Sequence, residues 1–165
     1  MSKKPRKPHF AGAIIYRETE GNFELLIQGS VSLDLAHPGS YGKLQMKWPG
    51  GTNRDSLKTW DARKTARREI REELWLKVRR GVNPDLLCVL AGDKIDMFFY
   101  FINFSDLQGK LRDKEIMDGL TKLLVPEWVS IEKASEIIYS THEPTLIPLA
   151  QYFETMNLAH SNVVS

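Results

Sequence analysis

The chain has 165 residues, a length typical of one domain that can bury a substantial core. Its formal net charge of +2 is too small to indicate nucleic-acid binding by itself, and its single cysteine, Cys88, excludes an internal disulfide. No apolar run approaches the roughly 18 to 20 residues that span a bilayer, and no signal-peptide core follows the basic N-terminus, so we expect a cytoplasmic protein with no membrane partner.

The first third of the chain predicts a tail, a hairpin and a loop. Residues 1–8 are rich in Lys, Arg and Pro, which indicates a disordered basic tail. Residues 9–16 are apolar and partly β-branched, residues 23–28 alternate, and the two runs predict a hairpin. Residues 29–43 predict a loop rich in Gly, Ser and Pro, and residues 44–48 predict a short strand.

The next segment predicts a helix over about residues 60–75, with Thr59 or Asp61 as its N-cap. Ala62, Ala66, Ile70 and Leu74 recur every four residues and form one apolar stripe. At about 100° per residue, three glutamates lie on one side of this stripe and four basic residues lie on the other. The glutamates are Glu69, Glu72 and Glu73, and the basic residues are Lys64, Arg67, Arg68 and Arg71.

Like charges are crowded along this helix. Between Arg63 and Glu73 the one attractive pair at a spacing of four is Arg68 with Glu72. Each like-charged pair costs about 0.2 to 0.5 kcal/mol in an isolated helix. A divalent cation among the glutamates would offset that repulsion, because hard cations such as Mg²⁺ bind carboxylate oxygens. The alternative is a merely solvated surface helix.

Residues 51–76 resemble the Nudix hydrolase box, G-x5-E-x7-R-E-U-x-E-E-x-G-U, where U is a bulky apolar residue. Gly51 begins the box, the six residues 68–73 match its central part without error, and Leu76 fits the final apolar position. Two positions depart from the box. Its early Glu falls on Trp60, after a loop that is three residues longer, and its late Gly is replaced by Trp75. Asp55 and Asp61 are candidates for the missing acid, and we expect the helix to end without the usual left-handed glycine.

The second half of the chain predicts strands followed by helices. Residues 86–91 and 95–104 predict two strands, and residues 105–122 predict a polar, acidic loop. Family members often draw one further carboxylate from such a loop, for which Glu115 is the first candidate and Asp118 the second. A last strand over residues 123–130, a helix capped by Ser130, and a final helix over residues 145–157 complete the prediction.

The resemblance implies an α/β fold, the Nudix-type α/β/α sandwich with a mixed sheet, in one domain over residues 9–158 with a frayed tail at 159–165. It also implies a metal-dependent hydrolase that cleaves a diphosphate linkage in a nucleoside diphosphate derivative. Mg²⁺ or Mn²⁺ would be bound by the Gly51 carbonyl and by Glu69, Glu72 and Glu73. One of these glutamates, or Glu115, would act as the base, and Arg68 would orient a glutamate, Glu72 by its spacing.

Two other functions are compatible with the same residues. The first is a non-catalytic Nudix-fold module that binds a nucleotide or a protein, which the tryptophans and the longer loop favour. The second is a pyrophosphohydrolase that acts on RNA ends, which the basic N-terminus favours. The expected partner is a nucleotide-type small molecule, a nucleic acid is not excluded, and the resemblance allows a homodimer because Nudix dimers are common.

Overall fold

The fold is given by a computed structural model that describes residues 7–53 and 60–163, with side chains as far as Asn157. Four predictions fall at least partly outside the described residues: the basic tail at residues 1–8, the candidate acid Asp55, the candidate cap Thr59, and the frayed tail at residues 159–165.

A long hairpin of β1 (His9–Thr19) and β2 (Asn22–Ser32) forms the centre of the sheet. On one side, β7 (Asp96–Asn103) pairs with β1 in parallel, and β6 (Asp85–Leu90) pairs antiparallel with β7, so the sheet is mixed. On the other side, short strands extend the sheet from β2. The remaining strands of this sheet are β3 (Gln45–Lys47), β9 (Ile116–Asp118), β10 (Thr121–Leu123) and β11 (Glu127–Ser130) around β2, and β4 (Gly50–Thr52) beside β1.

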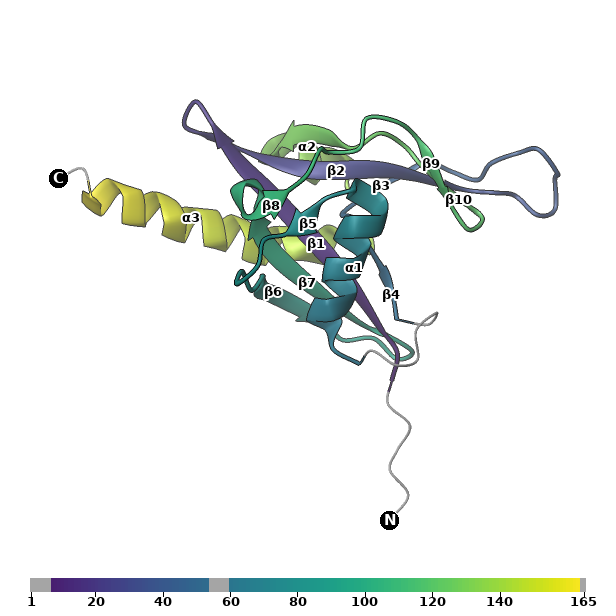
Figure 1. Cartoon of the computed structure of the whole chain (residues 1–165), viewed down its shortest axis with the longest axis horizontal. Coiled ribbons are helices and arrows are strands. Elements are labelled where there is room, and N and C mark those ends of the chain that lie inside the picture. Colours follow the sequence, from purple (N-terminus) through teal and green to yellow (C-terminus); the bar gives the residue numbers. More distant parts are fainter. Residues whose placement is uncertain (1–6, 54–59, 164–165) are drawn as a thin grey trace, which may run out of the picture.

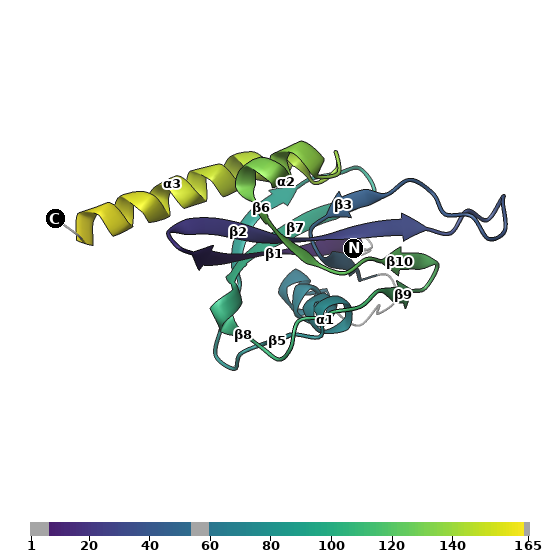
Figure 2. The ribbon, with the colours of Figure 1, turned by 90° about the horizontal axis from the view of Figure 1, so that it is seen from above.

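Helices cover both faces of the sheet, as Figure 2 shows: α1 (Ala62–Leu74) lies on one face, and α2 (Ile131–Ile137) and α3 (Leu146–Val163) lie on the other. Successive residues of β1 point to opposite faces. Ile14 therefore packs in the cluster that contains Leu149 of α3, while Ile15 packs in the cluster that contains Ile70 of α1. The predicted α/β/α sandwich with a mixed sheet is confirmed.

A second, two-stranded sheet joins β5 (Lys77–Val78) to β8 (Leu107–Gln108), close to the C-terminal end of α1. The short 3-10 turns η1 (Phe104–Asp106) and η2 (Glu143–Thr145) complete the order of elements. Among the helices of the described residues, none is both long and apolar enough to cross a membrane.

Three boundaries differ from the prediction. β2 continues to Ser32, so part of the predicted loop is strand, and residues 105–122 contain β8, β9 and part of β10. These segments lack a strong apolar pattern and become strands through pairing with distant segments, β10 with the outer end of β2 and with β9, and β8 with β5. The last helix, α3, reaches Val163, past the point where the sequence predicted a frayed tail.

Candidate active site

Two glycines bring the backbone of β4 close to α1. A methyl group at Gly51 would lie 2.5 Å from Oε1 of Glu69, so the Glu69 carboxylate rests directly against the Gly51 backbone. A methyl group at Gly50 would lie 2.5 Å from the carbonyl oxygen of Ala11, on the neighbouring strand β1. The Gly-Gly sequence is therefore required for close approach, on one side to the sheet and on the other to an acid of the helix.

Glu73 is almost fully buried, and its carboxylate is held at one oxygen. Oε2 accepts hydrogen bonds from the backbone N–H of Gly50, at 3.0 Å, and from the side-chain amide of Gln28. Burial, and secondly the charge of Glu69, raises the pKa of Glu73 to about 8. The buried carboxyl group is thus protonated at neutral pH unless a positive charge joins it.

Arg112 fixes the orientation of Gln28. Its Nη2 donates to Oε1 of Gln28 at 3.1 Å, so the Gln28 amide must turn its NH₂ group toward Glu73. Arg112 also donates from Nε to the backbone carbonyl of Glu73, at 2.6 Å, and from Nη2 to that of Leu124, at 2.9 Å. A fully buried arginine and a buried glutamine therefore set the position of Glu73.

Neither Gln28 nor Arg112 is among the residues that the sequence predicts for the site. The sequence could have indicated Gln28, because it is a polar residue that directly follows the apolar strand residues Leu25, Leu26 and Ile27. Arg112 had none, because it lies in a polar, charged segment where an arginine is ordinary.

Arg68 reaches back toward the acids. Its Nη2 lies 2.6 Å from Oε1 of Glu69 and donates to the carbonyl of Thr52 at 2.9 Å, and its Nε lies 3.7 Å from Oε2 of Glu72. The predicted contact with Glu72 is present, but the contact with Glu69 is shorter. Arg68 lies on the basic side of the helix, as expected, where it lines one cavity with Lys64, Arg67 and Arg71, and the tip of its side chain reaches the Thr52 carbonyl.

Glu69 is buried, whereas Glu72 is exposed. Burial raises the pKa of Glu69 most strongly, the Arg68 hydrogen bond and charge lower it, and the charges of Glu72 and Asp118 raise it. Glu69 and Glu73 are one helical turn apart and share the buried side of α1. Two of the three predicted carboxylates therefore point into the protein.

Among the loop acids, Asp118 is the one whose charge acts on Glu69. Glu115, the first candidate from the sequence, instead pairs with Lys122 at 2.7 Å. In the β9–β10 pairing, Asp118 lies opposite Thr121, which in turn lies opposite Ser32 of β2, while Lys122 lies on the other face. The structure thus separates Glu115 from the helix acids and brings Asp118 toward them.

A row of polar residues crosses the sheet on the face that carries Glu73. Lys47 lies opposite Gln28, and its charge acts on Glu73. The strands that carry this row extend beyond α1 at one end of the sheet, together with the β9–β10 hairpin and the loop that follows β2 (Figures 1 and 2). From the buried to the exposed end, the row consists of Gln28, Lys47, Ser30, Gln45, Ser32, Thr121 and Asp118.

The carboxylate oxygens of this site fit a hard divalent cation, although the described residues do not supply a cluster of three ligand side chains. Among the described residues, no three His, Cys, Asp or Glu side chains form a group able to hold a metal ion. Two carboxylates remain close to each other, Glu69 and Glu73, and only one oxygen of Glu73 is engaged by hydrogen bonds with described residues. Mg²⁺ usually takes one or two carboxylates and completes its shell with water and phosphate oxygens, so this pair is sufficient.

Both ends of α1 are built from local sequence. Asp61 has extended backbone angles and its side chain accepts a hydrogen bond from Arg63 N at 3.0 Å, as predicted for an N-cap. Trp75 ends the helix in the left-handed conformation, with φ of 63°. The helix thus ends without the usual glycine, as expected, and Trp75 adopts the left-handed conformation although it carries a Cβ.

His142 is buried in the protein, whereas Trp60 and Trp75 lie at its surface. The Nδ1 of His142 accepts a hydrogen bond from the backbone N–H of Trp48 at 3.2 Å. Trp60 and Trp75 are 36% and 43% exposed, so neither is a core residue.

Comparison with known proteins shows the fold. No protein-family model matches the sequence, and no curated protein matches it. A protein described as a Nudix hydrolase from Listeria monocytogenes matches with a TM-score of 0.62 and 17% identity, over 90% of this chain and 96% of that one. A mutT/nudix family protein from Listeria innocua matches with a TM-score of 0.58 and 14% identity, over 95% and 99%.

A third similar structure was solved with a bound ligand. The Nudix domain of NrtR from Shewanella oneidensis, solved in complex with ADP ribose, matches with a TM-score of 0.58 and 12% identity, over 91% of this chain and 90% of that one. The strand order, the helix beside the Gly-Gly segment and these matches together show that the chain has the Nudix fold.

Proposed function

We propose that this protein is a metal-dependent hydrolase that cleaves a diphosphate linkage in a nucleoside diphosphate derivative. The observation that carries the proposal is the pair of buried carboxylates, Glu69 and Glu73, held against Gly50 and Gly51 beside an open polar sheet face. Burying two neighbouring carboxylates is costly for folding, and such groups are concentrated at functional sites.

Each residue of the site has a role in this proposal. Glu69 and Glu73 would hold Mg²⁺ or Mn²⁺, with the Gly51 carbonyl and the exposed Glu72 as further ligands. The bound cation would neutralise charge on the diphosphate and lower the pKa of water. Glu72 or Asp118 would accept the proton of that water, a role typically worth about 10² to 10⁴ in rate.

Positioning falls to the neighbouring cations and amides. Gln28 and Gly50 donate to one oxygen of Glu73 and leave its other oxygen facing away from them. Arg68 holds Glu69 and Glu72 from the outer side. Lys47, on the polar face beside Glu73, is placed to attract a phosphate of the substrate.

The substrate class is supported by the polar row and by one neighbour. Lys47 offers a positive charge, and Ser30, Gln45 and Thr121 offer neutral donors and acceptors, a set suited to phosphate and ribose groups. The NrtR Nudix domain, of the same fold, was solved with ADP ribose, a nucleoside diphosphate derivative. We therefore expect this chain to act on that class.

The first test is turnover on a panel of nucleotide sugars, dinucleoside polyphosphates and nucleoside triphosphates, with and without Mg²⁺. In Glu72→Gln and Glu73→Gln we expect metal-dependent activity to be lost, because each change removes a charged ligand. The protein should stay folded, because Glu72 is exposed and a glutamine at position 73 has the same shape and keeps an oxygen that can accept from Gln28 and Gly50. Glu115→Gln is the matched control and should keep full activity, since Glu115 pairs with Lys122. Unchanged turnover in Glu73→Gln would refute the assignment.

A second candidate is a non-catalytic module that binds a nucleotide. It is favoured by Trp60, which stands where the box has a glutamate, and by the contact between Arg68 and Glu69. Binding of ADP ribose measured by calorimetry, with no product from any substrate of the panel, would select this candidate.

A further inference from the structure

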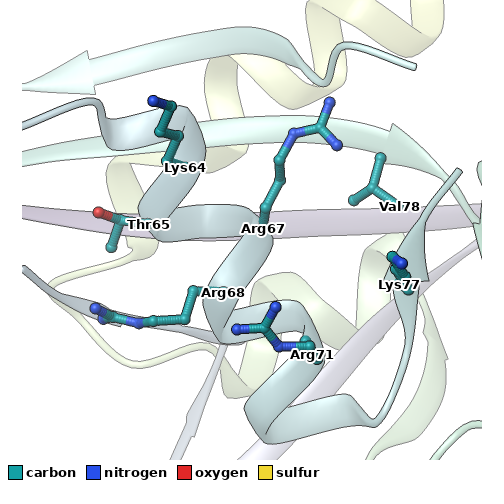
Figure 3. A pocket seen from close by; sticks show the side chains of 7 residues that line it. All are labelled: Lys64, Thr65, Arg67, Arg68, Arg71, Lys77 and Val78. Atoms are coloured by element: carbon teal, nitrogen blue, oxygen red, sulfur yellow. The ribbon is translucent and has the colours of Figure 1, made fainter. Parts of the chain in front are cut away.

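The outer surface of α1 carries a cavity lined by five cations and no acid. Figure 3 shows its seven lining side chains around α1 and β5, and its volume is about 370 Å³. Lys64, Thr65, Arg67, Arg68 and Arg71 come from α1, and Lys77 and Val78 come from β5.

Most of this positive charge is not neutralised by neighbouring acids. Arg68 already binds Glu69 and Glu72. Within the described residues, the ion pairs join other side chains and leave Lys64, Arg67, Arg71 and Lys77 without an acid within 4.0 Å. Arg67 donates one hydrogen bond to the carbonyl of Val82, which anchors its guanidinium but leaves its charge unpaired.

The spacing of these cations works against the helix. Arg67 and Arg71 are four residues apart, and Lys64 and Arg67 are three apart, so each pair repels by about 0.2 to 0.5 kcal/mol. Lys77 adds a further positive charge from the other wall of the cavity. A solvated helix face normally interleaves acids among such residues, whereas an anion bound in the cavity would relieve the repulsion.

We propose that this cavity, named the α1 cation site (Lys64, Arg67, Arg71 and Lys77), binds the phosphate groups of a chain of phosphates. Guanidinium groups bind phosphate oxygens in pairs, and lysines bind them as point charges. Four cations spread over two turns of helix and a facing strand suit several phosphates in series better than a single one. The source of such phosphates is either a nucleic-acid backbone or a free oligophosphate.

The α1 cation site is separate from the candidate active site. The cavity and the candidate active site have only Arg68 in common, which lines the cavity and pairs with Glu69, so Arg68 is left out of the α1 cation site and of the test. Lys64, Arg71 and Lys77 are exposed and make no contact with Glu69 or Glu73 among the described interactions. Binding at this site and hydrolysis at the other can therefore fail independently.

The test compares two full-length triple variants with equal loss of charge. The first is Lys64→Gln, Arg71→Gln and Lys77→Gln. The control is Lys94→Gln, Lys110→Gln and Lys133→Gln, three exposed lysines elsewhere. Both keep the basic N-terminus. The probes are a fluorescein-labelled single-stranded RNA with a 5′ hydroxyl, followed by anisotropy over a KCl series, and inorganic tripolyphosphate, followed by calorimetry.

We expect the site variant to bind at least about tenfold more weakly than the control, with a salt slope smaller by about 2 for three lost phosphate contacts on a single strand. Binding of RNA by the wild-type protein assigns the phosphates to a nucleic-acid backbone, and binding of tripolyphosphate alone assigns them to a free oligophosphate. Equal weakening in both variants, or no binding of either probe by the wild-type protein, overturns the proposal. Turnover of a small substrate should be unchanged in both variants, and its loss in the site variant would contradict the separation of the two sites. Absence of turnover in the wild-type protein would count only against the proposed enzyme.

Discussion

At the scale of single residues, Arg112 shows how one side chain organises a site without belonging to the motif. Its guanidinium and backbone join three segments: the end of α1 through Leu74 and Glu73, the strand β2 through Gln28, and the end of β10 through Leu123 and Leu124. Most of these acceptors are buried oxygens that would otherwise have no hydrogen-bond partner, so Arg112 supports both the fold and the placement of Glu73.

Arg112→Ala should therefore be strongly destabilising. It leaves the buried oxygens of Gln28, Glu73 and Leu124 without their donor, and we expect a loss of about 3 to 5 kcal/mol in the free energy of unfolding. Urea denaturation measures this change. Arg80→Ala, at an exposed position, is the control and should stay within about 0.5 kcal/mol of wild type. Similar values for the two variants would contradict the role given to Arg112.

Trp75 provides a second prediction at this scale, because it holds a left-handed conformation that disfavours residues with a Cβ. Trp75→Gly and Trp75→Ala lose the same ring contacts, including the one with Lys114, but only the glycine relieves the backbone strain. We expect the glycine variant to be more stable than the alanine variant by about 1 kcal/mol in thermal or urea unfolding. Equal stability would show that the backbone at Trp75 is unstrained.

At the scale of elements, the two sides of α1 carry residues with different roles. One side packs Ala66, Ile70 and Leu74 on the sheet and brings Glu69 and Glu73 to the Gly-Gly segment of β4. The other side carries the α1 cation site. On the opposite face of the sheet, the turn before α3 is joined to the connection between β3 and β4. Trp48 in this connection donates its backbone N–H to His142 and its indole N–H to Thr145, the latter at 2.9 Å.

The contact between Trp48 and His142 predicts that the folded state loses stability in acid. Burial, and secondly the charge of Lys47, lowers the pKa of His142 from 6.5 to about 3. Below about pH 6.5 His142 is protonated in the unfolded chain, but in the folded chain it stays neutral down to about pH 3. The free energy of unfolding therefore falls as pH decreases through this window, by at most about 1.4 kcal/mol per pH unit. The rings that surround His142 are those of Phe10, Phe99 and Tyr139.

The measurement is urea unfolding at about pH 7 and about pH 5, either side of the ordinary histidine pKa. His142→Gln cannot take up a proton, so its loss of stability between the two values should be smaller than that of wild type. His37→Gln, at an exposed position, is the control and should follow wild type. If His142→Gln also follows wild type, the histidine is not held neutral by the fold.

At the scale of the whole molecule, the sheet links the buried acids to an uncovered polar end. The long strand β2 carries both: Leu26 packs under α1, Gln28 binds Glu73, and Ser32 lies beside β10 at the outer end. A ligand on this face would therefore be in reach of the acids, and any cation that binds between them should stabilise the entire fold by mass action.

Magnesium should accordingly raise the melting temperature. At a concentration about a hundredfold above Kd, a ligand that binds only the folded state adds about 2.7 kcal/mol, which corresponds to roughly 5 to 10 °C for a domain of this size. In Glu73→Gln we expect a higher melting temperature without magnesium, because a buried carboxyl group with a raised pKa is replaced by a neutral amide, and no further rise with it. Glu115→Gln should keep the full rise, and a rise of equal size in Glu73→Gln would argue against Glu73 as a ligand.

The amino-acid sequence by itself determined the central hairpin, the helix α1, and the carboxylates of the candidate site, and its resemblance to the Nudix box implied the sandwich. The elements depend on local patterns: an apolar, partly β-branched run in β1, alternation in β2, and four-residue spacing in α1. Such signals are short-range, because each residue interacts with neighbours a few positions away.

Only the tertiary structure decided which residues surround those carboxylates. Gln28 lies 45 positions from Glu73 in the sequence, and Arg112 lies 39 positions from it. Neither contact can be predicted from the spacing of neighbouring residues. The choice of Asp118 over Glu115 depends on the pairing of β9 and β10 with β2, since one residue of shift in a strand turns a side chain to the opposite face. The folding of Arg68 back onto Glu69 likewise depends on the carbonyl of Thr52, on a different element.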